Sequence, residues 1–489
     1  MDFLDPKKQR LYGVRLFVGY CGVAIAILAA TWLLLNAAYG FGLSQGKVIQ
    51  TGIVFISSHP SGSNIYLDNE LENNTTNTRL SIISGTHALK ISRTGYGDWQ
   101  RTINVIGGSV AHYDYPLLIP SKLVTKDIKS YDGAPTLVTQ SPDRRWMLVM
   151  PGGATGATFD AYDLKNPKLA PTPLVLPAGL ASSGANQTWQ VVEWAGDNVH
   201  ALLQHTFAGK TEFILVDRTD PTLSLNLNTE LGISPTQLNL VHSKYDQYYA
   251  YDATTHDVDT LSLSKPAPVT LLQNVLNYKS YGSSILYVSS AASGAGKIAV
   301  DLYQDGKTYN LHELPAGSPT LLDITQYNGS WYVAFGTRAG NKIHVYKNPV
   351  VQLGSKLGAL VPIYELKLTA PDYLDFSPGS QYIAAENGSN FVVFDLKNDE
   401  GYSYNSQLPL DAPQSHATWM DGNRLIYVSG GHVVLFDYDH ANVHTLNAAS
   451  AAYAPVFNPG STFMDVLTAP GADGHARLTS TALLTPADQ

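Results

Sequence analysis

Few stretches of this sequence carry residue patterns of known catalytic chemistry. The string Gly-Leu-Ser-Gln-Gly at positions 42–46 matches the G-x-S-x-G pattern, in which the serine acts as a nucleophile. That chemistry needs a strand before the serine and a helix after it, because the sharp turn between them exposes the hydroxyl. Here the string follows a long apolar segment and opens a linker. The sequence therefore predicts that Ser44 is not catalytic.

Two tripeptides match the end of a phosphate-binding loop. They are Gly209-Lys210-Thr211 and Gly306-Lys307-Thr308. In both, the position of the loop's first glycine holds another residue, Gln204 or Asp301. We expect both tripeptides to be hairpin turns between strands, with no helix N-terminus to hold a phosphate.

One histidine pair has the spacing of metal ligands. His440 and His444 are four positions apart, with Asp437 and Asp439 close by in the sequence. On a helix this spacing would align two imidazoles toward one metal ion. The segment follows a predicted strand and is expected to be a connecting loop, where the alignment is lost. We therefore predict no metal site here, and no cofactor for the chain.

Other acidic residues also have a structural interpretation. His256 precedes Asp257 and Asp259 in what we expect to be a solvated hairpin. Four further aspartates end predicted strands, where a carboxylate commonly accepts backbone hydrogen bonds in a turn rather than binding calcium. These are Asp163, Asp217, Asp395 and Asp437.

Aromatic side chains are the remaining candidates for recognition. Tryptophan and tyrosine are frequent at binding surfaces and at sugar-stacking sites. The tryptophans in question are Trp189, Trp194, Trp331 and Trp419. We expect most of them to lie in the cores of sheets, so the sequence assigns no catalytic, metal-binding or ligand-binding residue.

An apolar segment near the N-terminus is the first structural element that the sequence predicts. No charged residue lies between Arg15 and Lys47. A transmembrane helix at 16–40 is predicted, because about 20 apolar residues span a hydrocarbon core of about 30 Å. The one cysteine, Cys21, lies in this segment, so no disulfide can form within the chain.

The flanking charges predict the orientation of this helix. Four basic residues precede it and only Lys47 follows it closely, so the positive-inside rule makes 1–15 a cytoplasmic tail. Residues 41–50 are then a linker, and the bulk of the chain is extracytoplasmic. A signal peptide cleaved near residues 36–38 and a buried soluble helix are the alternatives. The four basic residues are Lys7, Lys8, Arg10 and Arg15.

A small β-sandwich is predicted over residues 51–120, where short runs alternate apolar and polar residues. Here the sequence resembles the PEGA domain, through SSHPSGSNIYLD at 57–68, SGTHAL at 84–89 and GY at 95–96. Ser63 replaces the usual alanine, and Asn69 replaces a glycine, which Asn can do because it tolerates left-handed geometry. The resemblance implies a structural His87, a location at the cell surface and no chemistry.

The remainder, 121–486, repeats with a period of roughly 40–50 residues, as propellers and solenoids do. The clearest units lie at 137–164, 373–396 and 417–438, and weaker ones begin near Trp189, Thr236, Val275, Thr320 and Tyr453. They resemble blades of the translocation protein TolB and of Tricorn-like repeats, which implies a seven- or eight-bladed β-propeller. One or two β-sandwiches are the alternative. We expect the strand at 121–128 to close the ring by pairing with the last blade.

The sequence thus predicts an all-β chain with one transmembrane helix, a PEGA-like β-sandwich and a β-propeller. Its net charge of −9 argues against nucleic-acid binding. The predicted function is a non-enzymatic binding or scaffolding protein of the cell envelope. It contacts the lipid bilayer through residues 16–40 and binds a protein, a peptide or a cell-wall polysaccharide. The alternatives are an extracytoplasmic hydrolase or lyase, and a docking subunit of a secretion or envelope complex.

Overall fold

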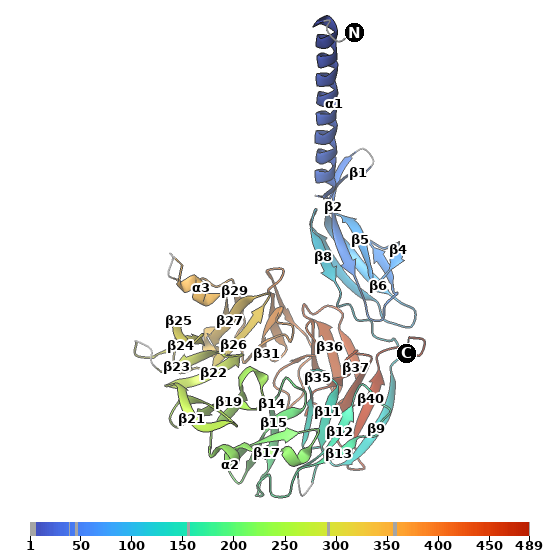
Figure 1. The fold of residues 1–489 in the computed structure, drawn as a ribbon. Helices are drawn as coiled ribbons and strands as arrows, with labels where there is room; N and C mark the ends of the chain where they lie inside the picture. The colour runs from blue at the N-terminus through green and yellow to red at the C-terminus, as the bar shows by residue number, and fades with distance from the viewer. Residues whose placement is uncertain are drawn as a thin grey trace. The chain divides into compact units, whose positions relative to one another are not determined.

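The chain forms two compact units in the computed structural model (Figure 1). One unit comprises residues 1–122 and 484–489, and the other comprises 123–483. The structure describes residues 6–38, 40–44, 47–153, 157–290, 294–355 and 359–488. Each unit is built almost entirely from short antiparallel strands, apart from the N-terminal helix.

Helix α1 runs from Pro6 to Ala38. Within it, Tyr12–Trp32 is long and apolar enough to cross a membrane, and the described part of the structure leaves this stretch unburied. The helix begins earlier than the expected position 16, because the basic residues before it are good helix formers and Pro6 suits the first turn. The expected linker at 41–50 also differs. It contains β1 (Phe41–Ser44) and the start of β2 (Lys47–Ile56), which pair antiparallel with Phe41 opposite Gln50.

Two four-stranded sheets follow the helix. The first contains β1, β2, β5 (Thr78–Ile83) and β8 (Val110–Tyr113), with β2 central between antiparallel β5 and parallel β8. The second has the order β4 (Glu70–Thr75), β3 (Asn64–Leu67), β6 (Gly85–Ser92) and β7 (Trp99–Val105). Their shared core includes Val54, Ile56, Ile65, Ile91 and Trp99. The expected sandwich is therefore present.

The turn between β3 and β4 explains a departure from the family pattern. Asp68 and Asn69 both have positive φ, at 52° and 72°, so a residue that tolerates left-handed geometry is needed at position 69. His87 lies in β6 rather than in a turn. Its Nδ1 contacts Asp68 Oδ2 at 2.6 Å and its Nε2 contacts the Ile83 carbonyl at 2.7 Å. Both ring nitrogens are thus occupied, in agreement with a structural role.

The second unit consists of eight four-stranded sheets in the part of the chain that the structure describes. We call them blades 1 to 8 in chain order. Blade 1 is β10 (Leu137–Gln140), β11 (Trp146–Met150), β12 (Thr158–Asp163) and β13 (Thr172–Val175). Blade 2 is β14 (Thr188–Trp194), β15 (His200–Phe207), β16 (Lys210–Asp217) and β17 (Leu225–Asn226). Blade 3 is β18 (Gln237–Leu240), β19 (Gln247–Asp252), β20 (Asp257–Ser262) and β21 (Lys265–Leu272). Blade 4 is β22 (Val275–Tyr281), β23 (Ser284–Ser289), β24 (Lys297–Gln304) and β25 (Lys307–Pro315).

The later blades repeat this order. Blade 5 is β26 (Thr320–Tyr327), β27 (Ser330–Thr337), β28 (Lys342–Lys347) and β29 (Tyr364–Lys367). Blade 6 is β30 (Tyr373–Phe376), β31 (Tyr382–Asn387), β32 (Asn390–Asp395) and β33 (Glu400–Asn405). Blade 7 is β34 (Thr418–Trp419), β35 (Arg424–Ser429), β36 (His432–Asp437) and β37 (His444–Ala448). Blade 8 is β38 (Val456–Phe457), β39 (Phe463–Leu467), β40 (His475–Ala482) and β9 (Val124–Asp132). Short helices lie between strands: α2 (Leu227–Leu231), α3 (Pro349–Leu353), and 3₁₀ turns at Pro221–Leu223, Val241–Ser243 and Arg338–Gly340.

Apolar residues of adjacent blades pack together, because a single four-stranded sheet cannot bury both of its faces. Phe159 of blade 1 and Leu203 of blade 2, for example, belong to one buried cluster. Tyr131 and Val456 of blade 8 pack with Val149 of blade 1 in another, which joins the last blade to the first. The second unit is therefore a closed eight-bladed propeller, and the predicted range of seven or eight blades resolves to eight.

Strand β9 closes the ring as predicted. It pairs antiparallel with β40, with Val124 opposite Ala482 and Asp132 opposite His475. The observed strand runs four residues beyond the expected end at position 128. The three preceding strands of blade 8 come from the C-terminal end of the propeller sequence, so chain segments far apart in sequence share one sheet. The expected propeller limits also differ slightly, because residues 484–486 group with the first unit.

Candidate binding groove between blades 2 and 3

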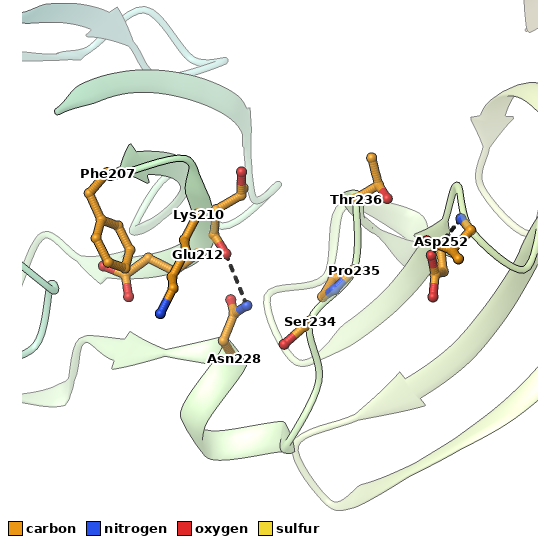
Figure 2. A pocket seen from close by; sticks show the side chains of 10 residues that line it. Phe207, Lys210, Glu212, Asn228, Ser234, Pro235, Thr236 and Asp252 are labelled. Atoms are coloured by element: carbon orange, nitrogen blue, oxygen red, sulfur yellow. Dashed lines mark hydrogen bonds between the residues drawn. The ribbon is translucent and has the colours of Figure 1, made fainter. Parts of the chain in front are cut away.

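A groove of about 540 Å³ lies where blade 2 meets blade 3 (Figure 2). One wall is the turn from β15 to β16, which contributes Phe207, Lys210 and Glu212. The opposite wall is the turn after β19, which contributes Asp252 and Thr254. The floor is the connection from blade 2 to blade 3, which includes α2 and supplies Asn228, Ser234, Pro235 and Thr236.

The floor is held by side-chain caps and hydrogen bonds. Asn226 caps α2 through a hydrogen bond from the Thr229 amide at 3.3 Å. The Asn228 side-chain oxygen Oδ1 accepts from the Phe213 amide at 2.8 Å, which ties the helix to β16. Gly232 ends the helix with a φ of 65°, a left-handed conformation that favours glycine. The residues after it are thereby directed toward the groove.

Glu212 supports the wall from behind and is fully engaged. Its carboxylate accepts from the Ser182 amide at 2.7 Å and from Asn226 Nδ2 at 2.9 Å, and it contacts His205 Nδ1 at 2.8 Å. Burial alone would raise the pKa of Glu212, but the hydrogen bonds outweigh it and hold that pKa below its usual value. His205 also contacts Gln187 Oε1 at 3.2 Å, so neither of its nitrogens is available as a base.

The groove leaves several groups available to a ligand. Lys210 is exposed, and among the described residues no acidic group pairs with its ammonium. Figure 2 shows Lys210 on the wall opposite Asp252. Asp252 Oδ1 accepts from the Thr254 amide at 2.7 Å, and the Thr236 hydroxyl accepts from the Ala253 amide at 3.0 Å. A cation, a carboxylate, hydroxyls and the half-buried ring of Phe207 together suit a polar ligand with an apolar face.

A second polar cluster lies on the first strands of blades 4 to 6. Asp323 of β26 is 3% exposed, and it accepts from the Phe376 amide of β30 at 2.7 Å. Its Oδ1 lies 3.9 Å from Lys279 Nζ of β22. Asp375 of β30 lies close enough to Asp323 and Tyr373 for both groups to influence its pKa. Burial, followed by the charge of Asp323, raises the pKa of Asp375 to about 7.

Asp323 and two related carboxylates tie neighbouring blades together. Glu193 of blade 2 accepts from the Leu240 amide of blade 3 at 2.6 Å. Glu386 of blade 6 accepts from the Ala417 amide next to blade 7 at 2.9 Å. Burial raises the pKa of Glu386 to about 8. Each carboxylate satisfies an amide that the neighbouring sheet leaves unpaired, which is a structural role.

Three of the four aspartates that end the third strand of a blade accept backbone hydrogen bonds as expected. The Lys165, Thr219 and Lys397 amides donate to Asp163, Asp217 and Asp395 at 3.0, 2.8 and 2.8 Å. The side chain at the start of the second strand adds a partner in each case. These partners are Arg145 for Asp163, His200 for Asp217, Gln381 for Asp395 and Arg424 for Asp437.

The other sequence candidates do not form sites. Ser44 ends β1 and precedes β2, so no helix follows it; its side chain lies outside the described part. The tripeptides at 209–211 and 306–308 are hairpin turns, as predicted. His440 lies in a loop with a φ of 67° and stacks on Tyr404, and burial lowers its pKa. His444 begins β37, so the pair is not aligned on a helix.

The remaining candidates are also accounted for. His256 occupies a turn with a φ of 61°, followed by Asp257 and Asp259 in β20. No group of three or more potential metal ligands occurs among the described residues. Trp189 and Trp194 are buried, whereas Trp331 and Trp419 are half-buried. No sequence pattern predicted the groove, because its walls come from turns of different blades.

Comparison with known proteins identifies the first unit. Residues 51–118 match the family model of the PEGA domain. This segment is a PEGA domain. The match covers the two-sheet region after the helix and stops before the propeller, so the PEGA domain accounts for only part of the chain. No curated protein sequence matches the chain.

Solved structures with a similar trace are propellers. One is the β-propeller domain of Myceliophteria thermophila Cps50 (Swd1), with 10% identity, 74% of this chain and 100% of that chain covered, and a TM-score of 0.38. Another is the Dos1 propeller, with 13% identity, 73% and 95% coverage, and a TM-score of 0.43. An oligogalacturonate lyase in complex with manganese shares 10% identity, 74% and 99% coverage, and a TM-score of 0.40. The fold assignment rests on the eight sheets themselves, and these likenesses add no functional argument.

Proposed function

We propose that this chain is a membrane-anchored extracytoplasmic binding protein of the cell envelope. Helix α1 anchors it, the PEGA domain follows, and the propeller binds a wall glycan or a peptide through the groove between blades 2 and 3. The observation that carries the proposal is that Lys210, which is exposed and has no acidic partner among the described residues, lies on one wall, and Asp252 lies on the other. Charged groups on opposite walls fix the orientation of a ligand, and the hydroxyl groups between them can form hydrogen bonds with the hydroxyls of a glycan.

The anchoring part rests on the apolar helix and the charges before it. The side chains of Tyr12, Phe17, Ile25 and Trp32 are exposed, and burying them in lipid is favourable. Arg10 and Arg15 precede the apolar stretch, which favours a cytoplasmic N-terminus. Protease added to intact cells should therefore digest the PEGA domain and the propeller. Survival of both, while a known surface protein is digested, would contradict the orientation.

The binding part can be tested with two matched lysine variants. Lys210 and Lys307 both occur in Gly-Lys-Thr turns and are both exposed, but only Lys210 lines the groove. Full-length protein in detergent micelles would be immobilised and exposed separately to the polysaccharide and the peptide fraction of envelope extract. We expect Lys210→Ala to reduce retention of one fraction at least about ten-fold, the effect of one lost charge-assisted hydrogen bond. Lys307→Ala should bind like the unchanged protein.

Equal retention by both lysine variants would contradict the groove as the binding site. Asp252→Asn provides a second check, because it keeps the size of the side chain and removes its charge. It should weaken the same fraction that Lys210→Ala weakens. A loss in an unrelated fraction would mean that the two residues do not share one ligand.

A second candidate function is an extracytoplasmic hydrolase or lyase. The cluster of Asp323, Asp375 and Tyr373 beside Lys279 is the observation that favours it, since carboxyls with raised pKa values serve as general acids. The test is turnover of a polysaccharide panel by the unchanged protein and by Asp375→Asn. Activity that this variant abolishes, without loss of groove binding, would favour the enzyme.

A further inference from the structure

The PEGA domain carries an exposed apolar face at the end where the helix enters. Ile53, Ile83, Ile106 and Val110 are 40%, 49%, 65% and 56% exposed. We call these four residues the apolar face. In the sheet, Ile53 pairs with Val110 of β8, and Ile83 pairs with Thr51 of β2. Paired residues point to the same side of a sheet, so Ile53, Ile83 and Val110 are neighbours. Ile106 lies in the connection between β7 and β8.

Backbone hydrogen bonds tie Gly40, two residues after the end of the helix, to this region. The Thr51 amide donates to the Gly40 carbonyl at 2.7 Å, and the Gly108 amide donates to the Thr51 carbonyl at 2.9 Å. Gly40 has a φ of 74°, and a Cβ there would lie 2.1 Å from the Thr51 carbonyl oxygen. The position therefore requires glycine, and it lies two residues after the end of helix α1. Ile106 lies two residues from Gly108 and thus close to the helix end.

The length of the helix sets the depth of this region. Arg15 is the last charged residue before the apolar run, so we place the start of the membrane span at Leu16, within the longer apolar stretch Tyr12–Trp32. From there, residues 16–35 span about 30 Å at about 1.5 Å each, which fills the hydrocarbon core. Ala38, where the helix ends, is about 5 Å further, and the headgroup layer is about 6 Å deep on each side. Gly40 and the residues bonded to it then lie at the level of the headgroups.

We propose that the apolar face contacts the outer surface of the membrane. The inference rests on the proposed anchoring through α1. The apolar face contacts lipid rather than another partner because the domain follows the membrane helix directly in the chain. Only Tyr39 separates Ala38, the last helical residue, from Gly40. Isoleucine and valine side chains can insert at the boundary between headgroups and acyl chains, as the apolar side chains of interfacial helices do. The contact would limit tilting of the PEGA domain on its helix.

The single cysteine makes a direct test possible. In a Cys21→Ser background, full-length protein with Ile106→Cys would be labelled with the environment-sensitive fluorophore NBD and placed in phosphatidylcholine–phosphatidylglycerol vesicles. Ser61→Cys is the matched control, since Ser61 is exposed and lies beyond the opposite end of β2. We expect a blue-shifted emission and at least two-fold stronger quenching by spin-labelled lipid at position 106 than at position 61.

Flotation of the same vesicles separates the two proposals. If the protein does not float with the vesicles, the anchoring itself is wrong. If it floats and both labels behave as in water, the anchoring stands and the membrane contact is overturned. A blue shift at position 106 without quenching by spin-labelled lipid would mean that protein covers the face, as in a dimer, which also overturns the proposal. Circular dichroism checks that each labelled variant is folded.

Discussion

The guanidinium of Arg93 pairs with the carboxylate of Asp488, a residue 395 positions further along the chain. Arg93 Nε also donates to Asp488 Oδ2 at 3.3 Å. The Tyr96 hydroxyl donates to the same carboxylate at 2.8 Å and accepts from the Thr485 amide at 2.8 Å. The C-terminal residues thus complete the PEGA domain, although the domain's own sequence ends more than 360 residues earlier.

Removing the Tyr96 hydroxyl should destabilise the PEGA domain. Tyr96 is 6% exposed, so Tyr96→Phe loses two buried hydrogen bonds and should cost about 1–2 kcal/mol. Hydrogen exchange of the β6 and β7 amides, measured by mass spectrometry on the full chain, reports this loss. Tyr66→Phe is the control, because the Tyr66 ring lies beside Lys90 and its hydroxyl has no such role. Equal exchange in both variants would contradict the prediction.

The same pair predicts an acid-sensitive C-terminus. The Arg93 hydrogen bond, with further bonds from Thr485 and Tyr96, holds the pKa of Asp488 at about 2, below the ordinary 3.8. A lowered pKa contributes stability that is present above about pH 4 and is lost as the pH falls toward 2. We expect the amides of Thr485, Ala487 and Asp488 to exchange faster as the pH falls through this window, after correction for intrinsic exchange. Asp488→Asn should remove the pH dependence.

The Asp375 carboxyl should make the propeller less stable at high pH. Its pKa of about 7 lies above the unfolded value, so the associated stability is present below about pH 4 and is lost as the pH rises through 7. Asp375→Asn should therefore raise the free energy of unfolding at pH 8 by roughly 1–3 kcal/mol, with little gain at pH 4. Urea denaturation followed by tryptophan fluorescence measures this. Asp305→Asn, in an exposed turn, should show no such difference.

Closure of the ring should depend on the buried side of β9. Tyr131 is 3% exposed between blades 8 and 1, and its hydroxyl lies 2.6 Å from that of Tyr162. Tyr131→Ala should reduce the free energy of unfolding of the propeller by about 3–5 kcal/mol. Ile128→Ala, on the same strand but 40% exposed, should cost less than about 1 kcal/mol. Similar costs for both would mean that β9 does not close the ring.

Packing of blade 6 against blade 5 can be tested at one glycine. A Cβ on Gly401 of β33 would lie 1.8 Å from the Tyr364 hydroxyl, and the Tyr364 ring stacks on Phe394 at 4.2 Å. Gly401→Ala should therefore cost about 1–3 kcal/mol through displacement of this ring. Gly379→Ala is the control, because a Cβ there meets only Gly422 at 3.9 Å. A neutral Gly401→Ala would show that Tyr364 can move aside freely.

The sequence alone determined the elements of this protein. The length of the segment without charged residues predicted the apolar helix. The alternation of apolar and polar residues, with a family pattern, predicted the PEGA domain, and the recurring units predicted the blades. These features are local, and the physical rules that produce them act within one strand, one turn or one helix. Even the closing strand followed from local counting, because the last repeat was one strand short.

Tertiary structure decided everything that joins distant parts of the chain. The pairing of Arg93 with Asp488, the groove between Lys210 and Asp252, and the cluster of Asp323 with Asp375 each combine residues from separate repeats or separate ends of the chain. No periodicity marks such positions, because a turn residue has the same local pattern whether or not another blade faces it. The exact number of blades was settled in the same way, since only the packing of the eight sheets closes the ring.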